Sequence, residues 1–191
     1  MGSKKESTFT TMVLTLLVIT AVAALALGGV YQLTKKPIAL AKKKKQEKAI
    51  KMVLPAFNKL ESVKIPSYDG GDSLLFTYAK KDGKIIGVAV NSYSDKGFSG
   101  HIEIMVGFLP DGTIYNTAVM AHKETPGLGT KMAEPKFKDQ FKGKNPASFK
   151  LKVKKDGGNF DAITAATISS RAFCDAVDRA YKTFKKEFKN Q

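Results

Sequence analysis

The sequence has very few of the residues that build disulfides and metal centres. It contains one cysteine, Cys174, and two histidines, His101 and His122. A single cysteine cannot form a disulfide within the chain and cannot supply a cysteine-based metal site. Two histidines are also too few for us to expect a zinc or haem centre. We therefore do not look to bound metal for the function of this chain.

Acidic residues are scarce relative to basic ones. Lysine and arginine number 32 against 17 aspartates and glutamates, which gives a formal net charge of +15. Such an excess favours an anionic partner, which can be a nucleic acid, a membrane surface, a phosphate-bearing ligand or an acidic protein. The hydrophobic content of 43% is that of a folded protein, and the length fits one domain with an appendage.

One stretch lacks charge altogether. Residues 12–31 read MVLTLLVITAVAALALGGVY. At about 1.5 Å of rise per residue, a helix of this length spans roughly 30 Å, the thickness of a bilayer core. We predict a transmembrane helix over residues 12–34, preceded by a short tail at residues 1–11. The alternative is a cleaved signal peptide with Ala24-Leu25-Ala26 as its cleavage site. Both interpretations tie the chain to a membrane.

A basic segment follows the apolar one. Residues 35–60 read KKPIALAKKKKQEKAIKMVLPAFNKL, and we predict a connecting helix here that Pro55 ends or kinks. This helix is either a solvated connector or a basic surface near anionic lipid headgroups. By the positive-inside rule its lysines would place the following domain in the cytoplasm, although long domains translocate largely regardless of charge.

Residues 61–191 are predicted to form one α+β domain. Two hairpins are expected, one over residues 74–93 with a turn at Asp82-Gly83, the other over residues 101–122 with a turn at Pro110-Asp111-Gly112. Their alternating apolar residues indicate half-buried strands of an antiparallel sheet.

Two more elements complete the predicted domain. Residues 147–158 suggest one more strand, with three apolar side chains on one face, and a long helix is expected from about Ile168 to Lys189. The apolar face of that helix consists of Phe173, Val177, Ala180, Tyr181, Phe184 and Phe188. Cys174 lies beside this face, and we interpret it as a small packing residue. The expected fold is α+β, with a single N-terminal transmembrane helix followed by an antiparallel sheet and packed helices.

The first stretch with the character of a binding site is AHKETPGLGTKM, residues 121–132. Gly127 and Gly129 allow the backbone to approach a flat or anionic ligand closely. Glu124 can accept a hydrogen bond from a ring N–H. The residues able to serve a phosphate or a polar ring edge are Thr125, Thr130 and Lys131. An ordinary turn between a strand and a helix explains the same composition.

The second such stretch is DAITAATISSRAF, residues 161–173, which holds no histidine or cysteine that could activate a hydroxyl. Its four hydroxyls stand at the start of the long helix, on Thr164, Thr167, Ser169 and Ser170. A helix N-terminus offers free N–H groups and a partial positive charge, so it favours a phosphate. The alternative is ordinary N-capping by Thr167 or Ser169.

Together the two stretches resemble the paired motifs of the FMN-binding domain family. The resemblance rests on ETPGLG at 124–129 and on D-x-x-T-A-A-T at 161–167, and with the N-terminal anchor it spans nearly the whole chain. The family includes the G subunit of the Rnf electron-transport complex and the C subunit of the Na⁺-translocating NADH:quinone reductase, and the short chain favours the former. The family usually has glycine where this sequence has Ala165, and a left-handed backbone there would strain an alanine.

The resemblance implies a covalently bound cofactor. FMN would be joined through its phosphate to Thr167, with Thr164 and Asp161 earlier in the same motif. The first motif would surround the flavin with Glu124, Thr125, Leu128 and Gly129, followed by Thr130 and Lys131. A separate flavin transferase would make the bond, so Thr167 would need no neighbouring base.

The resemblance further implies a redox subunit of a membrane-bound, ion-translocating ferredoxin:NAD oxidoreductase, a relay with no complete active site of its own. The expected partners are other membrane subunits, the flavin transferase and membrane lipid. The flavin domain is expected on the extracytoplasmic side of the cell membrane, contrary to the lysine count. Alternatives are the quinone-reductase C subunit, a stand-alone extracellular FMN-domain reductase, and an assembly subunit that has lost its flavin. We expect no nucleic-acid partner, because the lysines lack interleaved aromatic residues.

Overall fold

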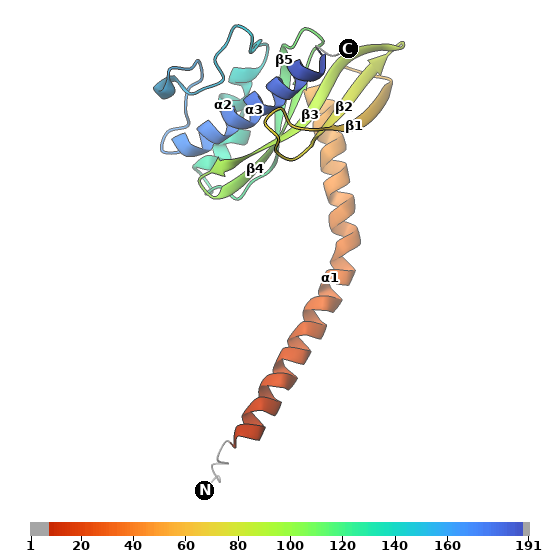
Figure 1. Cartoon of the computed structure of the whole chain (residues 1–191), viewed down its shortest axis with the longest axis vertical. Coiled ribbons are helices and arrows are strands. Elements are labelled where there is room, and N and C mark those ends of the chain that lie inside the picture. Colours follow the sequence, from red (N-terminus) through yellow and green to blue (C-terminus); the bar gives the residue numbers. More distant parts are fainter. Residues whose placement is uncertain (1–7, 189–191) are drawn as a thin grey trace. The chain divides into compact units, whose positions relative to one another are not determined.

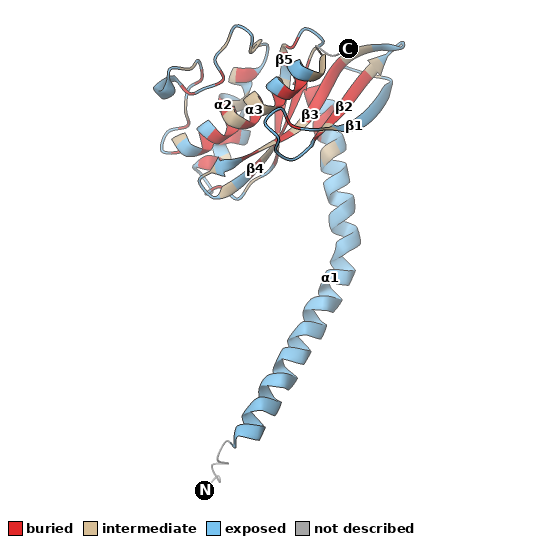
Figure 2. Cartoon of the chain, viewed as in Figure 1, coloured by how far each residue is buried: buried red, intermediate tan, exposed pale blue. Residues whose placement is uncertain are grey.

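The computed structural model describes residues 8–188, and the chain divides into two compact units, residues 1–44 and 45–191. In the first unit, helix α1 (Phe9–Val53) is exposed from its start to Lys44 (Figures 1 and 2). By length and composition α1 can cross a membrane. The two threonines in its apolar stretch are paired within the helix. The hydroxyls of Thr15 and Thr20 donate hydrogen bonds to the backbone carbonyls four residues earlier, over 2.7 and 2.9 Å.

The bounds of α1 differ from the predicted boundaries. The helix begins at Phe9 and continues without a break past residue 34. Residues 1–7 of the predicted tail lie outside the described residues. The prediction that Pro55 ends or kinks the connecting helix is confirmed, because α1 ends at Val53, two residues before Pro55. A residue that precedes proline is driven out of the helical region, which accounts for the earlier end.

The second unit is built on a five-stranded antiparallel sheet with the strand order β1-β2-β3-β4-β5 (Figure 1). The strands are β1 (Lys59–Ile65), β2 (Leu74–Lys81), β3 (Lys84–Gly97), β4 (Gly100–Phe108) and β5 (Ile114–Ala121). Both predicted hairpins are confirmed. Asp82 and Gly83 have φ of 51° and 79°, the left-handed pair that suits a two-residue hairpin turn. The edge strand β1 was not predicted.

Helices cover both faces of this sheet. Helix α3 (Thr167–Phe188) lies across one face (Figure 1). Its predicted apolar side chains pack into the larger core. The end of α1 that belongs to this unit packs Ala49, Ile50 and Val53 on the other face. The approach is close, since a Cβ at Gly107 of β4 would collide with the Val53 carbonyl.

The prediction of a strand within residues 147–158 is wrong. Lys154–Asp156 forms a 3-10 helix, and the only pairing is an isolated bridge between Val153 and Phe160. The backbone bonds within its own loop, for example from the Lys154 N–H to the Phe160 carbonyl over 2.8 Å. Leu151 and Val153 are both buried in the larger core, so this irregular segment has the same alternating burial as a strand.

The segment between β5 and α3 is anchored by aromatic rings. It contains a 3-10 helix (Gly129–Ala133), helix α2 (Pro135–Lys138) and a second 3-10 helix (Asp139–Phe141). The ring of Phe141 stacks on that of Phe160 with centroids 4.1 Å apart, and so holds this segment against the chain that leads into α3. Cys174 is buried in α3 as predicted, and burial raises the pKa of its thiol to about 12.

Candidate functional site

The second motif folds as a tight turn that leads directly into α3. The Ala166 N–H donates to the Ile163 carbonyl over 3.0 Å, which closes a four-residue turn around Thr164 and Ala165. Ala165 has a φ of 59°, in the left-handed region that a type II turn requires at its third residue and that glycine adopts without strain. The backbone at this alanine therefore has a conformation that glycine would adopt with less strain.

Two of the four hydroxyls in this motif hold the turn and the pocket in place. Ser170 is fully buried; its hydroxyl accepts from the Ile163 N–H over 2.9 Å and donates to the Ala166 carbonyl over 3.0 Å. It therefore fixes both ends of the turn to α3. Ser169 is also buried, and its hydroxyl donates to the carboxylate of Glu124. Because Ser169 lies inside α3, it is not the N-cap of that helix.

The other two hydroxyls are unpaired within residues 8–188. Thr167 is the first residue of α3 and is half-buried, whereas Thr164 is exposed on the turn. The first described backbone bond of α3 runs from the Ser170 N–H to the Ala166 carbonyl over 3.1 Å. The N–H groups of residues 167–169 have no partner in the described part of the chain. The helix start thus presents three free donors, one free hydroxyl and the positive end of the helix dipole.

The first motif forms the loop between β5 and the 3-10 helix Gly129–Ala133. The Leu128 N–H donates to the Thr125 carbonyl over 3.2 Å, and the Gly127 N–H donates to the Thr130 hydroxyl over 3.0 Å. Thr130 therefore stabilises its own loop. Leu128 is 40% exposed on this loop.

Glu124 is the residue at which the two motifs meet. Its side chain is 4% exposed; one oxygen accepts from the Ser169 hydroxyl over 2.5 Å and the other from the Ser99 N–H over 2.9 Å. Gly129 fits beside it only because it lacks a side chain. A Cβ at Gly129 would lie 2.5 Å from the Ser169 Oγ and 2.6 Å from a Glu124 oxygen.

A pocket of about 310 Å³ lies between these segments. It is lined by Phe98, Glu124, Thr125, Leu128, Gly129, Ala165, Ala166, Thr167, Ile168 and Ser169. Three of the lining side chains are apolar and strongly exposed, namely Phe98 at 69%, Leu128 at 40% and Ile168 at 46%. The pocket thus joins an apolar rim to the free N–H groups at the start of α3, an arrangement that suits a ligand with a flat apolar part and an anionic part.

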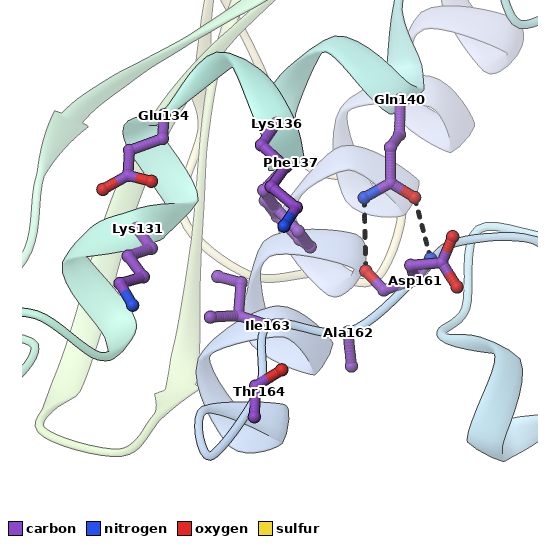
Figure 3. Close-up of a pocket in the computed structure, with 9 residues that line it drawn as sticks. All are labelled: Lys131, Glu134, Lys136, Phe137, Gln140, Asp161, Ala162, Ile163 and Thr164. Atoms are coloured by element: carbon purple, nitrogen blue, oxygen red, sulfur yellow. Dashed lines mark hydrogen bonds between the residues drawn. The ribbon is translucent and has the colours of Figure 1, made fainter.

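A second pocket, of about 440 Å³, is lined in part by residues that precede Ala165 in the same motif (Figure 3). Asp161, Thr164 and Lys131 line it, together with Phe137 of α2. Gln140 fixes the backbone of Asp161 at this pocket. Its side-chain oxygen accepts from the Asp161 N–H over 2.8 Å, and its side-chain nitrogen donates to the Asp161 carbonyl over 3.3 Å (Figure 3). The Asp161 carboxylate also pairs with a lysine outside the pocket, Lys154, at 2.8 Å.

The predicted site residues therefore fall into two groups. Five of them line the smaller pocket: Glu124, Thr125, Leu128, Gly129 and Thr167. Asp161, Thr164 and Lys131 line the larger one, and Thr130 lines neither. Within residues 8–188, no group of three or more histidine, cysteine, aspartate and glutamate side chains is placed to hold a metal ion.

Sequence reasoning missed the side chains of Phe98 and Ile168, which line the smaller pocket, and the backbone contact of Ser99 with Glu124. Phe98 stands on the turn between β3 and β4, and the Ser99 N–H beside it donates to Glu124. A large apolar residue between glycines, in KGFSG at residues 96–100, is the signal that could have identified Phe98. The Ser99 contact is made by backbone alone, so no side chain indicates it.

Comparison with known proteins gives one domain match and several relatives. A family model described as the FMN-binding domain matches residues 97–182. The G subunit of the ion-translocating oxidoreductase complex of Methanosarcina acetivorans is 35% identical over 184 residues, covering 94% of this chain and 95% of that protein. The G subunit from Escherichia coli O157:H7 is 36% identical over 80% of each chain. The G subunit from Erwinia tasmaniensis is 45% identical over 107 residues, which are 53% of this chain and 50% of that protein.

Two solved structures share the fold. The C subunit of the Na⁺-translocating NADH-quinone reductase from Parabacteroides distasonis aligns with a TM-score of 0.50 at 21% identity, over 63% of this chain and 65% of that one. NqrC of Shewanella oneidensis aligns with a TM-score of 0.50 at 23% identity, over 74% of each chain. At these identities the similarity shows the fold alone.

Proposed function

Because this chain belongs to the family of G subunits of ion-translocating oxidoreductase complexes, we propose that it carries FMN esterified to Thr167 and relays electrons through that flavin. The observation that supports this most directly is the position of Thr167. Its unpaired hydroxyl stands at the uncapped start of α3, in the same pocket as Glu124, Thr125 and Leu128 from the first motif.

The chemistry of the pocket fits the two ends of FMN. The free N–H groups of residues 167–169 and the helix dipole suit the phosphate. The exposed apolar side chains of Phe98, Leu128 and Ile168 suit the flat isoalloxazine ring. The volume of about 310 Å³ falls at the lower end of the range of about 300–1,000 Å³ typical of ligand pockets, which suits a flavin that remains partly exposed.

When bound, the flavin supplies the redox chemistry, and this chain contributes attachment, orientation and electrostatics. Within residues 8–188 no side chain hydrogen-bonds to the Thr167 hydroxyl, so no base on this chain is in place to activate it. This absence fits attachment by a separate flavin transferase. A partly exposed flavin also has an edge from which electrons can pass to another protein.

We further propose that the chain acts within a membrane-bound ferredoxin:NAD oxidoreductase, with other membrane subunits as its partners. Helix α1 would anchor it, and its exposed lysines, including Lys42 to Lys45, would lie near anionic lipid headgroups. The flavin domain would face the extracytoplasmic side, where a covalent tether matters because lost FMN could not be replaced from the cytosol. The near full-length match to a G subunit favours this assignment over the quinone-reductase C subunit.

The test is a fluorescence assay on the denatured protein. The full chain is expressed with a flavin transferase and run on an SDS gel, and the band is viewed under ultraviolet light. We expect a fluorescent parent band and a dark Thr167→Val band. Thr164→Val is the matched control, because Thr164 is the motif's other unpaired threonine but lines the other pocket; its band should stay fluorescent.

Two outcomes would contradict the proposal. A dark parent band, with the transferase shown to be active on another substrate, would mean that this chain does not accept a covalent flavin. If the band of Thr164→Val were dark and that of Thr167→Val fluorescent, the flavin would be attached to Thr164 and not to Thr167.

A further inference from the structure

Three segments of the proposed flavin pocket converge on the carboxylate of Glu124. Glu124 itself lies on the loop after β5. The Ser169 hydroxyl reaches it from the start of α3 over 2.5 Å, and the Ser99 N–H reaches it from the turn between β3 and β4 over 2.9 Å. Each of the three segments also contributes a side chain to the pocket lining. Glu124 therefore fixes the pocket walls relative to one another.

Backbone encloses this carboxylate on both sides. A Cβ at Gly97 would lie 2.7 Å from one Glu124 oxygen, and a Cβ at Gly129 would lie 2.6 Å from the other. Two glycines thus leave the space in which the carboxylate is packed. With only 4% of the residue exposed, water has little access to it.

The charge of Glu124 has no ionic partner in the described part of the chain. None of the ion pairs there includes it, and both of its hydrogen-bond donors are neutral groups. Hydrogen bonds from neutral donors stabilise a carboxylate but leave its net charge in place. A buried charge in a medium of low dielectric constant acts more strongly on its surroundings than an exposed one.

We propose that Glu124 sets the midpoint potential of the flavin through this buried negative charge. The inference rests on the proposed function, because it requires a flavin in the same pocket. Electrons that enter the flavin add negative charge beside Glu124 wherever proton uptake from solvent does not neutralise them. The carboxylate therefore disfavours the reduced state and lowers the midpoint potential. This role differs from the one predicted from the sequence, in which Glu124 accepts from a ring N–H.

Two substitutions separate this electrostatic role from a structural one. Glu124→Gln removes the charge and keeps the size and one acceptor, so the midpoint potential should become more positive. Ser169→Ala keeps the charge but removes a hydroxyl dipole that partly offsets it, so the potential should become more negative. Loosening of the pocket would move both variants in the same direction, because each substitution alters the contact between Ser169 and residue 124.

The control is Glu134→Gln. Glu134 is an exposed carboxylate that lines the other pocket, so solvent and salt screen its charge and its removal should leave the potential unchanged. The measurement is a spectroelectrochemical titration of the full-length, flavin-loaded protein in detergent. Dithionite supplies the electrons and solvent supplies the protons.

Opposite shifts in Glu124→Gln and Ser169→Ala, with none in Glu134→Gln, would support the inference. If Glu124→Gln does not fold or does not take up flavin, Ser169→Ala alone tests the inference. A midpoint potential of Ser169→Ala that equals the parent's or is more positive would overturn it. A flavin-loaded Glu124→Gln protein at the parent potential would overturn it while leaving the proposed function intact. A parent without flavin would overturn both, and the fluorescence of the parent band distinguishes that case.

Discussion

The hydroxyl of Ser169 donates a hydrogen bond of 2.5 Å to the carboxylate of Glu124, although 45 residues separate them in the chain. Each residue belongs to a different motif, one on the loop after β5 and the other in the first turn of α3. The bond is buried, so it persists only if both segments are held in register by the core around them. Two short motifs, each of which has an ordinary structural explanation alone, are therefore joined by one buried hydrogen bond.

The left-handed backbone of Ala165 predicts that glycine would stabilise the turn. A left-handed φ costs an L-residue roughly 1–2 kcal/mol, and the added freedom of glycine in the unfolded chain offsets part of the gain. Ala165 is exposed, so its methyl group contributes little packing. We expect Ala165→Gly to raise the free energy of unfolding by about 0.5–1 kcal/mol, measured by urea denaturation.

Ala162→Gly is the matched control for this prediction. Ala162 lies in the same segment, but its φ is not positive. Glycine there should lower the free energy of unfolding by about 0.5–1 kcal/mol. The prediction would be wrong if both substitutions lowered stability equally. A gain in stability accompanied by slower flavin attachment would show that the strain at Ala165 contributes to the proposed attachment at Thr167.

The buried hydroxyl of Ser170 predicts a large effect for the loss of one oxygen atom. In Ser170→Ala the buried Ile163 N–H would lose its hydrogen-bond acceptor. The Ala166 carbonyl would still accept a hydrogen bond from the backbone N–H of residue 170. Leaving a buried donor unpaired costs about 1–3 kcal/mol. We expect a fall of about 2 kcal/mol in the free energy of unfolding, with less flavin attached because the turn before Thr167 is released.

Ser148→Ala serves as the comparison, since Ser148 is exposed in a loop. Its effect should stay within about 0.5 kcal/mol. Equal losses in the two variants would mean that Ser170 does not fix the turn. Urea denaturation gives the stability, and flavin absorbance per chain gives the extent of attachment.

The parts of the fold that the sequence predicted are those with local signals. Asp82-Gly83 specifies a two-residue turn by its own backbone preferences, and the apolar spacing of α3 specifies one buried face. Strand β1 carries no such signal, because nearly all of its residues are exposed and no apolar alternation develops. The segment at 147–158 gave a false signal, because Leu151 and Val153 are buried from an irregular segment with the same alternation as in a strand.

The site was predictable at the level of its motifs but not of its contacts. The residue types around Thr167 and Glu124 identify both motifs, whereas the partition of Thr164 and Thr167 between two pockets depends on the turn at Ala165. The link from the Ser99 N–H to Glu124 uses only backbone. Contacts of this kind depend on the tertiary fold and leave no trace in residue type.

The carboxylate of Asp69 fastens the loop between β1 and β2 to α3, and it predicts a dependence of stability on pH. It accepts from the Ser67 hydroxyl over 2.6 Å and from Arg179 of α3 over 2.7 Å. The Ser67 hydrogen bond is the main cause that holds the pKa of Asp69 below its usual value, and the Gly71 N–H and the Arg179 charge also lower it. A lowered pKa in the folded state means that the unfolded chain takes up the proton first as the pH falls.

The stabilisation by Asp69 should therefore be complete above the unfolded pKa of about 3.9 and be lost as the pH falls through the lower folded value. At pH 7 we expect Asp69→Asn to lower the free energy of unfolding by about 1–2 kcal/mol. The difference from the parent should narrow below about pH 4, as followed by urea denaturation across that range. Asp72→Asn, an exposed residue of the same loop, should change stability little at pH 7. The prediction fails if the difference in the free energy of unfolding between Asp69→Asn and the parent stays constant down to about pH 2. The charge of Asp69 would then not be what stabilises the loop.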